Sequence, residues 1–450
     1  MRLMSYPHPD QPGTGAKSAG VHAAWAIIAS LAVVATAQAE LQIDITKGVS
    51  NPIPIAIVPW TGALPAGSNV DLAAVVQHDL DGSGRFKTME RGAIATRPAR
   101  AADVVAADWH AAGVDYVLVG RISAAAGTRA TVDCDLVNAL TGQTLGSTQV
   151  AASASNWRAA AHRISDFVFE KIVGARGAFA TRIAYVAVDG VPPKQHFQLM
   201  VADADGENWQ VILDSYQPIM SPAWSADGQW LAYVSFEHRA SEIVVQQLRT
   251  GERRTVSARA GVNQAPAWSP DGSRLALTLS GTGGNLDIYV LNLATQALTR
   301  ITDDPAIDTE PVWSADGASL YFTSDRSGGP QVYRTDVATH LRVQRITFGS
   351  SYNARPRLSP DGRTLALVTR EGSDFRIALQ DLASGNVRTL TRGSLDESPS
   401  FAPNGMSLIY AGRIDGRGAL ATVAIDGQVS QRLSDRGEVR EPVWGPFAGP

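Results

Sequence analysis

The chain has 450 residues, 44% of them hydrophobic and 18% charged, and its formal net charge is −4. Nucleic-acid-binding domains are usually basic, so this balance gives no support to a nucleic-acid partner. The single cysteine, Cys134, excludes an intrachain disulfide. It lies in the alternating stretch "ATVDCDLVN", which predicts a strand and a buried thiol.

Residues 1–39 have the pattern of a secretory signal peptide. Arg2 and Lys17 precede an apolar run over 23–35, and Ala37 and Ala39 form an A-x-A cleavage site before Glu40. The run is shorter than the roughly 20 residues that a membrane span needs. We therefore expect an exported protein without a membrane anchor, located in the periplasm if the source is a bacterium.

Residues 40–178 mix strand and helix patterns without a long repeat, which predicts an α/β domain with a mixed sheet. The helix patterns place apolar residues on one face, and the strand patterns alternate or lie between prolines. We expect helices near 69–80, 102–112 and 156–174, and strands near 52–60, 114–122, 130–138 and 145–152. A glycine-rich stretch, "GARGAF", joins this domain to residues 179–450.

A repeat fills residues 179–450. Phrases such as "PAWSPDGSRLAL" recur, and their prolines are 44, 45, 45, 43 and 43 residues apart. A typical unit has a strand with Pro-x-Trp (Pro-x-Leu at Pro356 and Pro-x-Phe at Pro399), an Asp-Gly or Asn-Gly turn and three further short strands, which is the pattern of propeller blades. The six prolines are Pro222, Pro266, Pro311, Pro356, Pro399 and Pro442.

The ends of the repeat region predict how the ring closes. The first unit, near Ile183, lacks a Pro-x-Trp strand, whereas the final "EPVW" at Glu441–Trp444 is a surplus one. If this last strand joins the unit near Ile183, every one of the six units has both an inner Pro-containing strand and a second strand. We therefore expect a six-bladed β-propeller closed by the C-terminal strand, which leaves no exposed sheet edge at the junction.

The sequence offers little catalytic chemistry. It contains no G-x-S-x-G nucleophile motif, and the propeller histidines His196, His238 and His340 are scattered over different blades. A propeller hydrolase or lyase with a site in the channel stays open as an alternative. The acidic stretch "DDPAIDTEP" at 303–311 is either a hard-cation site or a solvated loop, and both interpretations stay open at this point.

The mouth of the propeller is the expected binding surface, because loops on a rigid scaffold usually carry function. Residues just before each repeat proline should surround this mouth and form a polar ring of both charge signs, suited to a protein or peptide ligand. The candidate residues are Met220, Ser221, Asn263, Gln264, Ala265, Asp308, Thr309, Glu310, Asn353, Arg355, Asp396, Glu397, Arg440 and Glu441.

The start of the mature chain, "ELQIDITKGVSN", alternates apolar and polar residues. It is either an edge strand of the first domain or a free strand that pairs with another protein's sheet.

The blade repeats together with "ELQIDITKGVSNPIPIAIVPW" resemble the TolB family, the periplasmic propeller proteins of the bacterial Tol-Pal system, over essentially the whole mature chain. The resemblance implies a non-enzymatic, monomeric linker without cofactor or metal, which acts in outer-membrane integrity and in envelope constriction at cell division. It implies binding of the lipoprotein Pal at the mouth, with Asn263, Ala265, Thr309 and Glu310 among the contacts. Some members carry histidine where this chain has Val262, so that contact differs here.

The same resemblance implies that the N-terminal segment binds TolA. Its residues are Glu40, Leu41, Gln42, Ile43, Asp44, Ile45, Thr46, Lys47 and Gly48.

Overall fold

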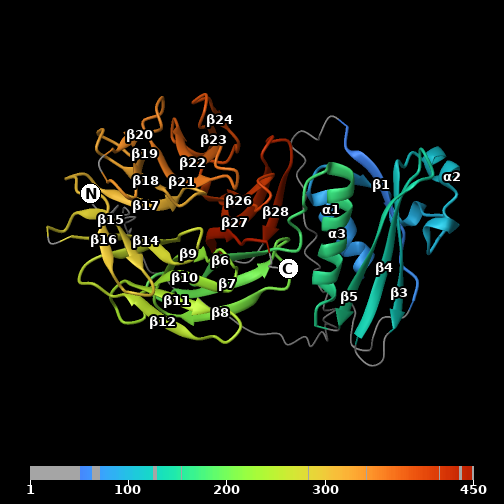
Figure 1. Ribbon diagram of the computed structural model, residues 1–450, viewed down its shortest axis with the longest axis horizontal. Coiled ribbons are helices and arrows are strands. Elements are labelled where there is room, and N and C mark those ends of the chain that lie inside the picture. Colours follow the sequence, from blue (N-terminus) through green and yellow to red (C-terminus); the bar gives the residue numbers. More distant parts are fainter. Residues whose placement is uncertain are drawn as a thin grey trace, which may run out of the picture. The chain divides into compact units, whose positions relative to one another are not determined.

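The computed structural model describes residues 51–62, 71–124, 129–153, 155–281, 283–340, 342–414, 416–434 and 438–447. The predicted signal peptide and the segment Glu40–Gly48 lie outside these residues. Within the described part of the chain, no helix is long and apolar enough to cross a membrane. The described elements form an α/β domain followed by a β-propeller (Figure 1).

The α/β domain contains a five-stranded mixed sheet in the order β2-β1-β3-β4-β5. Strand β1 pairs in parallel with β2 and β3, whereas β3, β4 and β5 pair antiparallel. This confirms the predicted mixed sheet. The strands are β1 Ile53–Ile57, β2 Phe86–Thr88, β3 Tyr116–Ala124, β4 Arg129–Asn138 and β5 Thr144–Ser153.

Two helices pack together on one face of this sheet, α1 Leu72–Gly82 and α3 Trp157–Val173 (Figure 1). The carboxylate of Asp71 accepts a hydrogen bond from Ala74 N and caps the start of α1. Gly174 ends α3 in the left-handed conformation, with φ of 79°. Both helices confirm the expected pattern because each buries its apolar face against the sheet.

The helix expected at 102–112 is shorter than predicted. The chain forms a 3₁₀ turn at Ala101–Asp103, and α2 then spans only Ala106–Ala111. The backbone N–H of Ala101 donates to Asp135 on β4, which holds the start of the segment against the sheet, and no side chain caps α2. A second 3₁₀ turn spans Arg91–Ala93. Strand β2 was not expected, since three residues are too few to show alternation.

Cys134 is 1% exposed and lies in the core between the sheet and the two helices. Burial raises the pKa of its thiol well above the ordinary value, and the neighbouring carboxylates of Asp135 and Asp133 raise it further. A thiol in these surroundings stays protonated and unreactive. The prediction that Cys134 is buried is therefore confirmed.

The second domain consists of six four-stranded antiparallel sheets that succeed one another in sequence (Figure 1). In each sheet the Pro-x-Trp strand or its equivalent is at one edge, and these edge strands contact one another around the ring. The predicted six-bladed propeller is therefore confirmed, with the Pro-x-Trp strands innermost.

The first three blades begin with the one that joins both ends of the propeller. The first blade contains β29 Glu438–Trp444, β6 Arg182–Asp189, β7 His196–Asp203 and β8 Gln210–Ser215. The second contains β9 Ile219–Trp224, β10 Trp230–Ser235, β11 Glu242–Gln247 and β12 Arg253–Ser257. The third contains β13 Asn263–Trp268, β14 Arg274–Ser280, β15 Leu286–Asn292 and β16 Leu298–Arg300.

The remaining three blades keep the same strand order. The fourth contains β17 Asp308–Trp313, β18 Ser319–Ser324, β19 Gln331–Asp336 and β20 Gln344–Arg345. The fifth contains β21 Asn353–Leu358, β22 Thr364–Glu371, β23 Asp374–Asp381 and β24 Val387–Thr389. The sixth contains β25 Glu397–Phe401, β26 Ser407–Ile414, β27 Arg417–Ala424 and β28 Ser430–Ser434.

The C-terminal strand closes the ring. Strand β29 pairs antiparallel with β6, with Trp444 opposite Ile183 and Val443 opposite Ala184. The first blade is thus built from both ends of the propeller, as the count of first and second strands predicts.

The Asp-Gly turns join the first and second strands of the blades. In the third blade, Asp271 accepts hydrogen bonds from the hydroxyls of Ser269 and Ser273 and from the backbone of Ser273. Gly272 comes next with φ of 70°, a conformation that favours glycine. These hydrogen bonds lower the pKa of Asp271 to about 2, so its carboxylate keeps the turn closed over most of the pH range.

Candidate functional site: the propeller mouth and channel

The inner strands all begin at the same end of the propeller, which we call the mouth. The loops that join a fourth strand to the next inner strand lie there, and so do the loops between second and third strands, because neighbouring strands in each blade are antiparallel. The predicted site residues are therefore distributed over the start and middle of the six inner strands.

Four of the predicted site residues are buried at the first or preceding position of an inner strand. Asn263 is 0% exposed; its Oδ1 accepts from the hydroxyl of Ser257 and the N–H of Arg259, and its Nδ2 donates to the carbonyl of Arg259. Such side chains hold the mouth loops in place, and Asn263 and Asn353 do so by bonding to the preceding blade, so they are not exposed to a partner. The four are Asn263, Asp308, Asn353 and Asp396.

Asp308 is the charged member of this group that pairs with an arginine. Both of its carboxylate oxygens accept from Arg326, at 2.9 and 2.8 Å. Burial raises the pKa of Asp308, and the hydrogen bonds from Ser324 and Arg326 oppose that rise. Arg326 also lies 3.8 Å from Asp304, and Arg300 lies 2.8 Å from Asp303. The acidic stretch at 303–311 thus meets an arginine at each of these carboxylates, which favours an ion-paired loop over a hard-cation site.

The residue before each repeat proline adopts the left-handed conformation, although none of the six is glycine. Their φ values lie between 50° and 57°. Each one coincides with a register shift in the pairing of its inner strand, so each inner strand carries a bulge at this point. The six residues are Ser221, Ala265, Glu310, Arg355, Ser398 and Glu441.

These bulge residues line a channel cavity of about 240 Å³ together with most of the repeat prolines and the side chains of Trp224, Trp268 and Trp444. They connect neighbouring blades. Glu310 Oε2 accepts from the backbone N–H of Arg355 at 3.0 Å, and Glu441 accepts from the backbone N–H of Ser221. The bulges therefore place a hydrogen-bonded ring of side chains around the channel wall, inside the mouth.

The charge in the channel centres on Arg355. Its Nε lies 3.3 Å from Glu310, its guanidinium lies 3.8 Å from Glu397, and it donates to the hydroxyl of Ser398. Burial alone would lower the pKa of Arg355, but the carboxylates of Glu310, Glu397 and Glu441 raise it above its ordinary value. The described residues that line the cavity include no histidine or cysteine, and the carboxylate of Glu310 is already bonded to Arg355.

The predicted residues that reach the mouth surface are partly or fully exposed. Met220 is 41% exposed, Arg440 is exposed, and Gln264, Thr309 and Glu397 are half-buried. Gln264 Nε2 donates to the hydroxyl of Thr309 at 3.3 Å, which joins the third blade to the fourth. This arrangement presents hydrogen-bonding groups and both charge signs around the mouth.

Comparisons with known proteins agree with this architecture. A family model described as the TolB beta propeller domain matches residues 169–448, and one described as the TolB amino-terminal domain matches residues 41–145. The chain belongs to the TolB family.

The TolB relatives resemble the chain along nearly all of its length. A Tol-Pal system protein TolB from Thioalkalivibrio sulfidiphilus is 50% identical over 416 residues, which cover 91% of this chain and 95% of the relative. One from Xylella fastidiosa is 44% identical over 416 residues, covering 92% and 94%. The crystal structure of TolB from Acinetobacter baumannii has a TM-score of 0.81 and 40% identity, and it covers 90% of this chain and all of that one.

The mouth of this TolB-family propeller also carries exposed apolar side chains that are not among the predicted site residues. Tyr216 is 78% exposed, Val191 75%, Phe348 64% and Leu395 42%. All four lie in loops at the mouth, outside the short stretches before the prolines. The sequence contains a signal for them, because each is a large apolar residue in a predicted loop. An apolar side chain that is not needed for the core indicates a contact surface.

Proposed function

We propose that this chain is a non-enzymatic, periplasmic linker of the Tol-Pal system. It binds the peptidoglycan-associated lipoprotein Pal at the propeller mouth and TolA through Glu40–Gly48, and it supports outer-membrane integrity and envelope constriction at cell division. The observation that carries the proposal is a mouth with exposed apolar and polar side chains, on a chain that matches TolB proteins across both domains.

The geometry suggests three different roles for the candidate Pal-binding residues. Residues with accessible side chains would contact Pal, and buried residues would hold the mouth loops in shape. The contacts would be Met220, Gln264, Thr309, Glu397 and Arg440, the loop-holding residues Asn263, Asp308, Asn353 and Asp396, and the channel-wall residues Ser221, Ala265, Glu310, Arg355 and Glu441.

The exposed apolar side chains at the mouth, Val191, Tyr216, Phe348 and Leu395, strengthen the case for a protein partner. Interfaces draw most of their binding energy from a few large side chains in contact with the partner, with polar groups around them. Tyr216 packs against the ring of His196, with 4.9 Å between ring centroids, so its orientation is partly fixed before a partner arrives. Tyr216 and Met220 lie on either side of the entry into β9 and would form one apolar contact area.

The alternative of a channel hydrolase or lyase gains no support from the described channel wall. Its ionisable side chains are glutamates and arginines, and the pair Glu310 and Arg355 is already bonded across blades. Such groups form a structural ring rather than a nucleophile with its base.

Substitution of Thr309 tests the Pal site. Thr309→Ile replaces a hydroxyl that bonds to Gln264 with a larger apolar group at the mouth. We expect a loss of Pal capture in a pull-down, with an unchanged circular dichroism spectrum.

Thr295 provides a matched control. It is exposed in the turn between β15 and β16, at the opposite end of the propeller. Thr295→Ile makes the same chemical change and should capture Pal as the wild type does. Full capture by Thr309→Ile would move the Pal site away from the mouth.

Deletion of residues 40–50 from the mature protein tests the second partner separately. We expect loss of binding to the C-terminal domain of TolA and normal capture of Pal. Retained TolA binding by a folded deletion variant would contradict this role and favour an edge strand of the α/β domain.

A further inference from the structure

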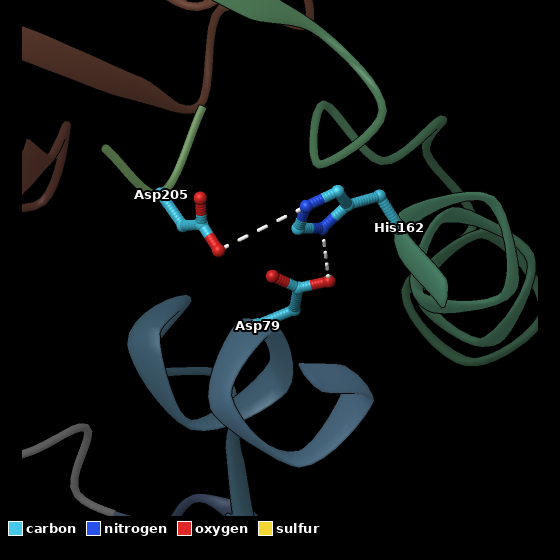
Figure 2. A group of neighbouring side chains, drawn as sticks. All are labelled: Asp79, His162 and Asp205. Atoms are coloured by element: carbon cyan, nitrogen blue, oxygen red, sulfur yellow. Dashed lines mark hydrogen bonds and ion pairs between the residues drawn. The ribbon is translucent and has the colours of Figure 1, made fainter. Parts of the chain in front are cut away.

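A buried group of ionisable side chains lies outside the mouth and the channel. His162 on α3 is flanked by Asp79 on α1 and by Asp205, which comes after β7 in the first blade (Figure 2). Their exposed fractions are 1%, 5% and 9%. Ligand atoms of these three residues lie within 4.8 Å of one another. Burial of so many ionisable groups is costly unless each charge is compensated.

Asp79 fixes the orientation of the imidazole. Its Oδ2 lies 2.8 Å from His162 Nδ1 and also accepts from the hydroxyl of Ser165 at 2.6 Å. A carboxylate that accepts from Nδ1–H leaves the lone pair of the neutral ring on Nε2. Histidines that bind metals usually have such a partner on their other nitrogen.

The Nε2 atom of His162 points toward two further carboxylates. It lies 3.6 Å from Asp203 Oδ2 and 3.8 Å from Asp205 Oδ2, which are separations longer than hydrogen bonds. Among the described residues, neither His162 Nε2 nor Asp203 Oδ2 has a hydrogen-bond partner. Two donor atoms of one tetrahedral zinc ion are separated by about 3.3 Å, given bond lengths of about 2.0–2.2 Å. Small side-chain rotations would therefore bring these atoms onto one ion.

The charges also favour a cation. Asp79, Asp203 and Asp205 contribute three negative charges, and Arg158 contributes one positive charge through its contacts with Asp203 and Asp205. The next ionisable groups, Arg182 beside Asp203 and Asp166 near Asp79, add one charge of each sign. With a neutral imidazole the group carries two uncompensated negative charges, which a divalent cation would neutralise.

We propose that His162 Nε2 and the carboxylates of Asp203 and Asp205 bind a divalent transition-metal ion, with Asp79 orienting the imidazole. Imidazole together with carboxylates suits Zn²⁺ best among common ions. The ion links α3 to the turn after β7 and takes over part of the role of Arg158. Binding to the folded chain alone raises its stability by mass action.

Zinc titration of the tag-free mature protein, stripped with a chelator, tests the site. Calorimetry should show one saturable Zn²⁺ per chain, and the melting temperature should rise with Zn²⁺ concentration. Asp205→Asn and His162→Gln should each abolish saturable binding. Asp79→Asn, which removes only the orienting charge, should weaken binding roughly 10- to 100-fold.

Two controls make the test specific. His196→Gln removes a more exposed histidine that also pairs with a carboxylate, Asp214, and it should leave Zn²⁺ binding unchanged. Arg158→Gln removes the cation that competes for Asp203 and Asp205, so it should tighten Zn²⁺ binding. If the group is only an ion-pair network around a protonated imidazole, Arg158→Gln destabilises the protein and produces no Zn²⁺ site.

The proposal fails if neither the wild type nor Arg158→Gln binds Zn²⁺ saturably. It also fails if a folded Asp205→Asn variant binds as the wild type does. If His162→Gln does not fold, a second measurement takes its place. Co²⁺ is added to the wild type and to Asp79→Asn, and its visible absorption is recorded. Absence of a ligand-field band in the wild type, or an identical Co²⁺ titration in Asp79→Asn, would overturn the assignment.

Discussion

The indole Nε1 of Trp444 donates a 2.8 Å hydrogen bond to the hydroxyl of Thr181, which lies 263 positions earlier in the chain. The backbone N–H of Trp444 donates to Ser400 in the sixth blade, and Gly445 N donates to the carbonyl of Arg182. One short segment therefore bonds to both ends of the propeller and holds the first and sixth blades together.

Removal of residues 441–450 should open the ring. The first blade would lose most of its inner strand, and the edge of β6 would become available for pairing with other chains. Since total stabilities are typically about 5–15 kcal/mol, we expect no cooperative native melting and early aggregation. Calorimetry and light scattering check this.

A chain that ends at Phe447 is the control for this truncation, because it keeps all of β29. It should melt and elute as the full chain does. A 441–450 deletion that stays monomeric and melts normally would show that β29 is not needed for closure.

Asp166 should make stability depend on pH. Its carboxylate accepts from the backbone N–H groups of Phe179 and Ala180, between the two domains. Burial is the largest influence and raises its pKa from 3.8 to about 6. The folded chain therefore holds a proton that the unfolded chain releases between these values. Stability from this group is present below about pH 4 and is lost as the pH rises through about 6.

Asp166→Asn measures this dependence. The variant has no charge to bury, so its free energy of unfolding should rise relative to the wild type by about 2 kcal/mol between pH 4 and pH 7. Urea unfolding at a series of pH values gives the difference. Asp108→Asn, which changes an exposed carboxylate on α2, should show a constant difference. If the difference in unfolding free energy between Asp166→Asn and the wild type is also the same at every pH, Asp166 does not contribute to the pH dependence of stability.

Gly120 on β3 should not tolerate a side chain. A Cβ added there would lie 2.6 Å from Cδ1 and Nε1 of Trp60, so the indole would have to move. Crowding of this kind costs about 1–3 kcal/mol. We expect Gly120→Ala to lower the unfolding midpoint in urea accordingly.

Gly92 offers the comparison for this substitution. A Cβ at Gly92 meets no atom within 4 Å, so Gly92→Ala should leave the midpoint nearly unchanged. Equal midpoints for the two variants would mean that Trp60 adapts without cost.

The repeat made the propeller predictable from the sequence. Each repeat proline marks one inner strand, and the surplus Pro442 predicts closure onto the strand at Ile183, as the structure confirms. The α/β domain was also largely predictable, because its two main helices show strong apolar periodicity. The short length of α2 was not predictable, because a hydrogen bond from Ala101 N to Asp135 fixes the position of the chain that precedes this helix.

Local sequence could not separate the roles of neighbouring mouth residues. Asn263 and Gln264 are adjacent and both polar, yet the first is buried in its own loop and the second reaches the next blade. The left-handed backbone at Glu310 and Arg355 was equally hidden, because neither residue type favours it. His162 meets Asp79 and Asp205 only through the tertiary fold, with 83 positions separating the first pair in sequence.

The joint between β29 and β6 also governs when the propeller can finish folding. As the chain emerges from its N-terminal end, β6 can pair with β7 at once, but the partner for its inner edge lies about 250 residues later. At the roughly 5–20 residues per second of synthesis, the wait for this partner is on the order of 13 to 50 s. Until then β6 has a free edge, and the last strand to arrive decides whether the whole ring becomes native. Chains cut short anywhere in the propeller would therefore fail at the same joint, whichever blade they lack.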